Sequence, residues 1–85
     1  MNLIYNSAHY SVLEFRAESG LEALRYGAFE ILDKPSQREI FLAGPLAETF
    51  RQHVQALSAQ RPTEEEIDEF LGSYTPLMAQ PVILQ

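Results

Sequence analysis

The sequence predicts an α+β fold in which a small antiparallel β-sheet of four to five strands carries two α-helices packed on one face. The first half of the chain holds short segments rich in β-branched and aromatic residues, separated by turn residues. The second half holds two segments whose apolar residues recur at helical spacing. Strands that precede the helices, rather than alternate with them, favour an antiparallel sheet. With 85 residues, the chain is expected to form one domain over residues 1–85.

The first hairpin is predicted within residues 3–15, LIYNSAHYSVLEF, where Tyr, Ile, Val and Phe favour strands and an Asn-Ser step marks a turn. A two-residue loop would place Tyr5 opposite Tyr10 and Leu3 opposite Val12. The sequence therefore predicts two short strands here, with this register as the expectation to be tested.

A second hairpin is predicted over residues 29–42, after a connection at 16–27 that is expected to contain about one helical turn. Lys-Pro-Ser-Gln at 34–37 suits a loop built on a type I turn, since proline favours its second position. This centre pairs Asp33 with Arg38, Ile31 with Ile40, and Phe29 with Leu42. Because side chains alternate along a strand, all six should share one face, with Ile31 and Ile40 pointing inward.

Two helices are predicted after this hairpin. Residues 45–59 begin with proline at the first helical position and repeat apolar residues at helical spacing. Residues 61–72 contain a capping box, in which Thr63 and Glu66 satisfy each other's backbone amides. Gly72 is the expected C-terminal cap. Two prolines in the tail exclude a further long helix, and Val-Ile-Leu at 82–84 fits either a fifth strand or a peptide laid over apolar surface.

The composition excludes several classes of protein. The chain has no cysteine, which excludes disulfides, a thiol nucleophile and cysteine-ligated zinc. Its net charge of −6 argues against a nucleic-acid partner, because affinity for phosphates comes from Lys and Arg. No signal peptide and no membrane-spanning run are visible, so a cytoplasmic protein is expected.

The candidates for chemistry each have a plain structural interpretation beside the functional one. The acids Glu64, Glu65, Glu66, Asp68 and Glu69 fit a solvated helix start better than a metal site, since no calcium-type loop surrounds them. His9 and His53 could serve a triad only if geometry brought them partners, because no sequence motif frames a serine. Lys34, at a turn, should be exposed and therefore unsuited to Schiff-base chemistry. No cofactor and no metal are predicted.

A partner-contact surface is the functional feature that the sequence favours most. The second face of the 29–42 hairpin mixes acids with apolar residues, and the tail is apolar. The candidate contact residues are Leu32, Phe41, Leu77, Met78, Val82 and Ile83. Either the tail covers this face within one chain, or another subunit or protein does, because exposed apolar patches usually mark contacts.

The ordered set of runs MNLIYNS, FEILDK, REIF, AETFR, EEIDEFLG and MAQPV resembles a family of short proteobacterial proteins of unknown function. The resemblance covers nearly the whole chain. It implies a similar length and an intracellular protein, and it supplies no catalytic or binding residues.

These observations lead to three functional hypotheses. The first is a small cytosolic protein-interaction or regulatory module without catalytic activity, which includes a homodimer. The second is a small enzyme or ligand-binding protein with a pocket near His9 or His53 and an acid within hydrogen-bond reach. The third is nucleic-acid binding, which requires one basic face formed by Arg16, Arg25, Lys34, Arg38 and Arg51.

Overall fold

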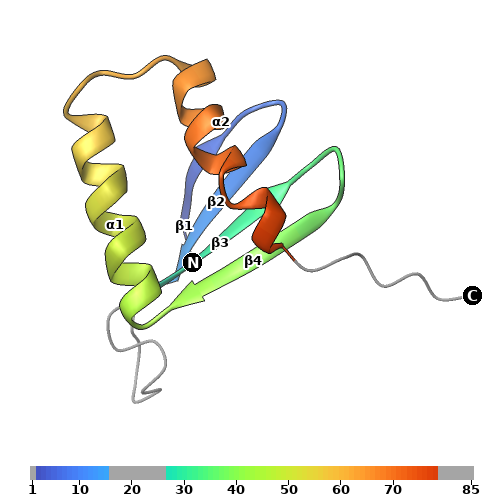
Figure 1. Cartoon of the computed structure of the whole chain (residues 1–85), viewed down its shortest axis with the longest axis horizontal. Helices are drawn as coiled ribbons and strands as arrows, with labels where there is room; N and C mark the ends of the chain where they lie inside the picture. The colour runs from blue at the N-terminus through green and yellow to red at the C-terminus, as the bar shows by residue number, and fades with distance from the viewer. Residues whose placement is uncertain (1, 16–26, 79–85) are drawn as a thin grey trace, which may run out of the picture.

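The computed structural model describes residues 2–15 and 27–78 and contains one four-stranded antiparallel sheet with two α-helices (Figure 1). The strands follow one another in the order β1-β2-β3-β4. Their bounds are Asn2–Asn6 for β1, Tyr10–Phe15 for β2, Ala28–Asp33 for β3 and Arg38–Ala43 for β4. The helices are α1, Pro45–Ser58, and α2, Glu64–Gly72, followed by the 3₁₀ turn η2, Thr75–Leu77. The predicted α+β fold is confirmed.

The second hairpin has the predicted register. The pairs across β3 and β4 are Asp33 with Arg38, Ile31 with Ile40, and Phe29 with Leu42. Residues 34–37 form the turn, and Gln37 closes it with a left-handed backbone (φ 56°). Ile31 is fully buried and Ile40 packs against the core, so both point inward as predicted.

The first hairpin forms, but its predicted register is wrong. Tyr5 pairs with Val12 instead of Tyr10, and Leu3 pairs with Leu13 instead of Val12. The register also shifts between Leu3 and Tyr5, where β1 carries an extra residue. This irregularity turns Leu3 to the side of the sheet away from Tyr5, because an added residue reverses the alternation of side chains.

The cause of the register error is a loop longer than two residues. The backbone amide of Ser7 donates to the carbonyl of Tyr10 at 2.8 Å. The Ser7 hydroxyl in turn accepts hydrogen bonds from the backbone amides of His9 (3.2 Å) and Tyr10 (3.1 Å). A serine side chain thus organises residues 7–9 as the loop, a local interaction that competes with a two-residue turn.

Both helices begin as predicted. Gly44 precedes α1 with a positive φ of 62°, a conformation that glycine adopts without steric cost, and Pro45 follows at the first helical position. In α2 the Thr63 hydroxyl accepts from the Glu66 amide at 3.2 Å, and the Glu66 carboxylate accepts from the Thr63 amide at 3.2 Å. The capping box is therefore confirmed.

The predicted role of Gly72 is wrong. Gly72 is the last residue of α2, and the cap that follows it is Ser73, with an ordinary right-handed backbone. The chain continues directly into the 3₁₀ turn η2 instead of reversing through a left-handed glycine. A Cβ at position 72 would lie 3.2 Å from the Tyr10 hydroxyl, so glycine here makes room for a side chain of β2.

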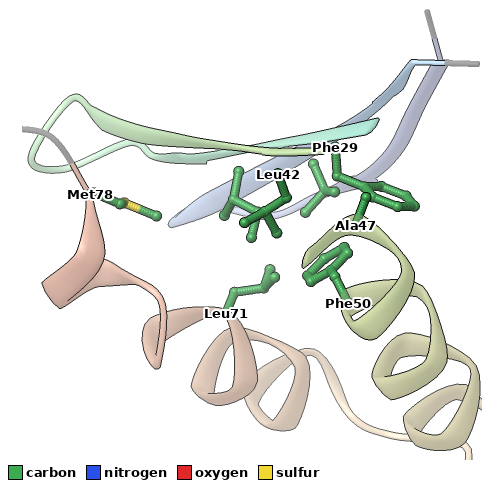
Figure 2. Close-up of a cluster of buried hydrophobic side chains, with 8 residues drawn as sticks. Phe29, Leu42, Ala47, Phe50, Leu71 and Met78 are labelled. Atoms are coloured by element: carbon green, nitrogen blue, oxygen red, sulfur yellow. The ribbon is translucent and has the colours of Figure 1, made fainter. Parts of the chain in front are cut away.

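The core lies between the sheet and the helices, and both helices cover the same face of the sheet (Figure 2). Phe50 of α1 is at its centre and is fully buried. Its ring centroid is 4.9 Å from that of Phe29, 5.9 Å from that of Phe70 and 5.6 Å from that of Tyr74. One aromatic side chain therefore joins α1 to β3 and to the segment from α2 to η2. The helical turn expected within 16–27 and the strand expected at 82–84 lie outside the described residues.

Candidate functional site

A polar cluster joins the first hairpin to α2 at Asp68. The Oδ1 atom of Asp68 accepts hydrogen bonds from the Tyr5 hydroxyl at 2.8 Å and from the Ser7 hydroxyl at 2.9 Å. Its Oδ2 atom lies 3.5 Å from Nδ1 of His9. The Asp68 side chain is 18% exposed, whereas that of His9 is 65% exposed. We call these four residues the Asp68 cluster.

The Asp68 cluster raises the pKa of the Tyr5 hydroxyl. Partial burial of Tyr5 and its hydrogen bond to the Asp68 carboxylate raise the pKa of Tyr5 to about 12. Both causes oppose the formation of a second negative charge beside the carboxylate. At neutral pH, Tyr5 is therefore a hydrogen-bond donor that holds Asp68 in place.

The cluster contains the residue types of a hydrolytic triad but not its connections. In a triad, the serine hydroxyl gives its proton to histidine, and the aspartate orients that histidine. Here the Ser7 hydroxyl donates to Asp68, and its oxygen accepts from the loop amides. Open, shallow hollows adjoin His9 and Asp68. The arrangement fastens a loop to a helix and leaves His9 exposed beside it.

The remaining acids of α2 have separate positions. Glu66 is used in the capping box, and Asp68 belongs to the cluster described above. Glu64, Glu65 and Glu69 are exposed. Over residues 2–15 and 27–78, no three His, Cys, Asp or Glu side chains gather in a way that could hold a metal ion.

The other candidates from the sequence lie apart from the Asp68 cluster. His53 is exposed on α1, with its ring 6.2 Å from that of Phe70. Lys34 is half-buried instead of exposed, because its ammonium donates to the Asn6 side chain and to the Ser7 carbonyl across the sheet. Lys34 thus ties the second turn to the first.

A small apolar cavity of about 160 Å³ lies between β1 and the two helices. Its walls include Ile4, Val54, Leu57 and Ile67. Tyr5 is also one of its walls, so the cavity shares that residue with the Asp68 cluster, whereas Asp68 and His9 do not line it. It is a gap in the packing between the two helices and the edge of the sheet.

The face of the sheet opposite the helices carries a second apolar surface. We call it the outer face and define it by the alternate residues Leu3, Ser11, Leu13, Phe15, Ala28, Glu30, Leu32, Glu39, Phe41 and Ala43. One row across all four strands consists of Leu3, Leu13, Glu30 and Phe41. Leu3 and Phe41 are 57% and 52% exposed, and the ring of Phe15 contacts that of Phe41 at 5.8 Å between centroids.

Two carboxylates share the outer face. Glu30 stands directly between Leu13 and Phe41 in the row just described, and Glu39 occupies the next row of the adjacent strand. Partial burial raises the pKa of Glu30, and the charge of Glu39 and a hydrogen bond with its side chain raise the pKa further. A half-buried acid with an acidic neighbour is unfavourable in the isolated protein.

The predicted contact residues fall in three places. Leu32 and Phe41 lie on the outer face, as the alternation of side chains along β3 and β4 predicts. Leu77 is 68% exposed on η2, whereas Met78 is only 5% exposed and belongs to the core. Val82 and Ile83 lie outside the described residues.

Sequence reasoning missed Leu3, Leu13 and Phe15 as members of this surface. Leu13 and Phe15 alternate with the inward Val12, a signal that the sequence of β2 contains. Leu3 could not be placed in this way, because the irregularity in β1 changes its side.

The sheet and the two helices on one of its faces define a small two-layer α+β protein, and no helix of the described residues covers the outer face. The chain belongs to the family described as "Protein of unknown function (DUF3567)", which matches residues 1–85 and confirms the resemblance. It is 50% identical over 84 residues to a protein of Burkholderia thailandensis, covering 99% of each chain. No solved structure matches. In the part of the chain that the structure describes, no helix is long and apolar enough to cross a membrane.

Proposed function

We propose that the protein is a small cytosolic protein-interaction or regulatory module without catalytic activity, whose contact surface is the outer face. The observation that supports this most strongly is the row across the outer face, in which Leu3, Leu13 and Phe41 are the apolar members beside Glu30. Apolar side chains that are half exposed on a flat surface gain free energy when a partner removes them from water.

The size of the outer face indicates the kind of contact. Four strands at ~4.8 Å spacing and six residues at ~3.3 Å per residue cover roughly 380 Å². A stable complex usually takes about 800 Å² from each partner. The outer face alone therefore suits a weak, reversible contact, which fits a regulatory module better than an obligate dimer.

Affinity capture from the native cell extract tests this proposal with three forms of the protein. Phe41→Ser changes an exposed aromatic residue of the outer face on the edge strand β4, and Leu77→Ser makes the same kind of change at an exposed site on η2. Proteins retained by wild type and by Leu77→Ser, but lost with Phe41→Ser, would support the proposal. Equal capture by all three forms, with unchanged circular dichroism, would reject it.

A ligand-binding or catalytic role beside His9 is the second candidate. It is favoured by the 3.5 Å separation of His9 from Asp68 and by the hollow next to them. The Ser7 proton is already committed to Asp68, so this site lacks an activated hydroxyl nucleophile. Titration of small-molecule mixtures while following the imidazole proton signals of His9 tests this role, and signals that never move would remove it.

The lysine and arginine side chains that the structure describes do not favour nucleic-acid binding. Lys34 is bound to the first hairpin, and Arg38 lies opposite Asp33 on the inward side of β4. Arg51 is on α1, where it lies over the ring of Phe29 and contacts Glu48. Each of these three cations therefore already has acidic, polar or aromatic groups of this chain beside it, which does not favour a groove for phosphates.

A further inference from the structure

We infer that the partner places one cationic side chain, an arginine or a lysine flanked by apolar residues, between Glu30 and Glu39 on the outer face. This inference rests on the proposed function and specifies the chemistry of the partner. It also selects a different protein over a second copy of this chain.

The geometry of the two carboxylates is set by the register of β3 and β4. Glu30 pairs with Phe41, and Leu32 pairs with Glu39, so the two acids are diagonal neighbours on adjacent strands. Diagonal positions lie about 7–8 Å apart at the backbone, within reach of long side chains. One cation above this point could contact both carboxylates.

The apolar residues around Glu30 make such a contact stronger than one at an ordinary surface. Leu13 and Phe41 lie directly opposite Glu30 on the two neighbouring strands, and Leu32 follows on the same side of β3. Partial burial raises the pKa of Glu30, which reports poor solvation of its charge. A charge that is already partly desolvated loses less hydration when a partner covers it.

Within the described ranges, Glu30 and Glu39 are the only charged residues of the outer face. Glu14 of β2 lies opposite Phe29 and so points to the helical side. The ammonium of Lys34 is held by the first hairpin. Over the described residues, the outer face presents an apolar surface with two carboxylates, one on β3 and one on the edge strand β4, and charge complementarity favours a cation from the partner.

The same charges disfavour a second copy of this chain as the partner. Two outer faces packed against each other would bring four carboxylates into one poorly solvated layer. Like charges at such an interface oppose association. At neutral pH the outer face should therefore reject itself while it accepts a cationic partner.

Peptide titration tests the inference. The probe is a short synthetic peptide in which one arginine is flanked by alternating leucines, and its matched partner carries citrulline, which has nearly the same shape without the charge. Binding to the ¹⁵N-labelled full-length protein is followed by the backbone amide signals of β3 and β4. The arginine peptide should bind about three- to tenfold more tightly than the citrulline peptide, and its shifts should be largest near Glu30 and Glu39.

Two double variants separate a specific contact from general attraction to an acidic protein. Glu30→Gln with Glu39→Gln should abolish the preference for arginine. Glu65→Gln with Glu69→Gln makes the same change in net charge at exposed positions of α2 and should leave the preference intact. Circular dichroism establishes that both variants fold.

The outcomes distinguish the two proposals. Equal affinity for both peptides at the outer face would overturn the cation inference and leave the contact surface standing. If neither peptide shifts the amides of β3 and β4, or the shifts appear on α2 instead, the outer face fails as a contact surface too. Sedimentation at pH 7 that shows a dimer, abolished by Phe41→Ser, would overturn the choice of a different protein as partner.

Discussion

Replacing Asp68 tests whether one carboxylate fastens the first hairpin to α2. Asp68→Ala removes the acceptor of two hydrogen bonds, from the hydroxyls of Tyr5 and Ser7. A hydrogen bond to a charged group contributes about 1.5–3 kcal/mol. Each hydroxyl retains a longer alternative, Tyr5 to the Glu64 carbonyl at 3.3 Å and Ser7 to the Tyr10 carbonyl at 3.4 Å. These alternatives recover part of the loss, so we expect the free energy of unfolding to fall by about 2–4 kcal/mol.

This loss is large beside the total stability of a chain of 85 residues, which is of the order of 4–13 kcal/mol. Asp68→Asn keeps the shape of the side chain and one acceptor oxygen, so it should lower the free energy of unfolding by about half as much as Asp68→Ala. His9→Ala should lose less than about 0.5 kcal/mol, because the His9 side chain is 65% exposed and exposed ion pairs contribute little.

Urea unfolding followed by circular dichroism measures these differences. Glu65→Ala is the matched control, since Glu65 is an exposed acid on the same helix. A double-mutant cycle between Asp68→Asn and Tyr5→Phe isolates the shared hydrogen bond, and the two changes should cost less together than the sum of their separate effects. The reasoning is refuted if Asp68→Ala is no more harmful than Glu65→Ala, or if the two changes in the cycle are additive.

Three further results are expected. Thr63→Ala removes the capping box of α2 and should lower the free energy of unfolding by about 0.5–2 kcal/mol in urea, so an unchanged midpoint would contradict the cap assignment. Gly72→Ala should cost less stability in a Tyr10→Phe background than in wild type, because the Tyr10 hydroxyl is the atom that a new Cβ would meet. An equal loss of stability from Gly72→Ala in the two backgrounds would argue against this contact. Tyr5 has a raised pKa in the folded state, so its contribution to stability is complete below about pH 10, its unfolded value, and is lost as pH rises toward about 12. An absorbance titration of wild type against Tyr5→Phe should show one phenol ionising near pH 12, and a difference spectrum centred near pH 10 would refute it.

The parts of the fold that were predicted correctly depend on neighbouring residues. The 29–42 hairpin follows from a proline turn between two strands of alternating residues, so its register could be read along the chain. The helix starts were likewise predictable, because the Thr63 capping box and the proline of α1 act within one turn. The outer face around Phe41 and Leu32 followed from the same alternation.

The parts that were predicted wrongly depend on contacts between distant residues. The register of the first hairpin is the exception, because its immediate cause is the local Ser7 loop, although Ser7 is also held by Asp68, 61 positions away. Gly72 is explained by Tyr10 of β2 and not by the end of its own helix. No local pattern marks Met78, a candidate contact residue of the tail, as the core residue that it is in the structure.

The sequence by itself determined the α+β class, the second hairpin and both helix starts, because each follows from hydrogen bonds and side-chain periods that span a few residues. Only the tertiary structure decided which polar residues meet at Asp68 and that Met78 is buried in the core. The physical reason is that packing joins segments that are far apart along the chain, and no local pattern records which of them will touch.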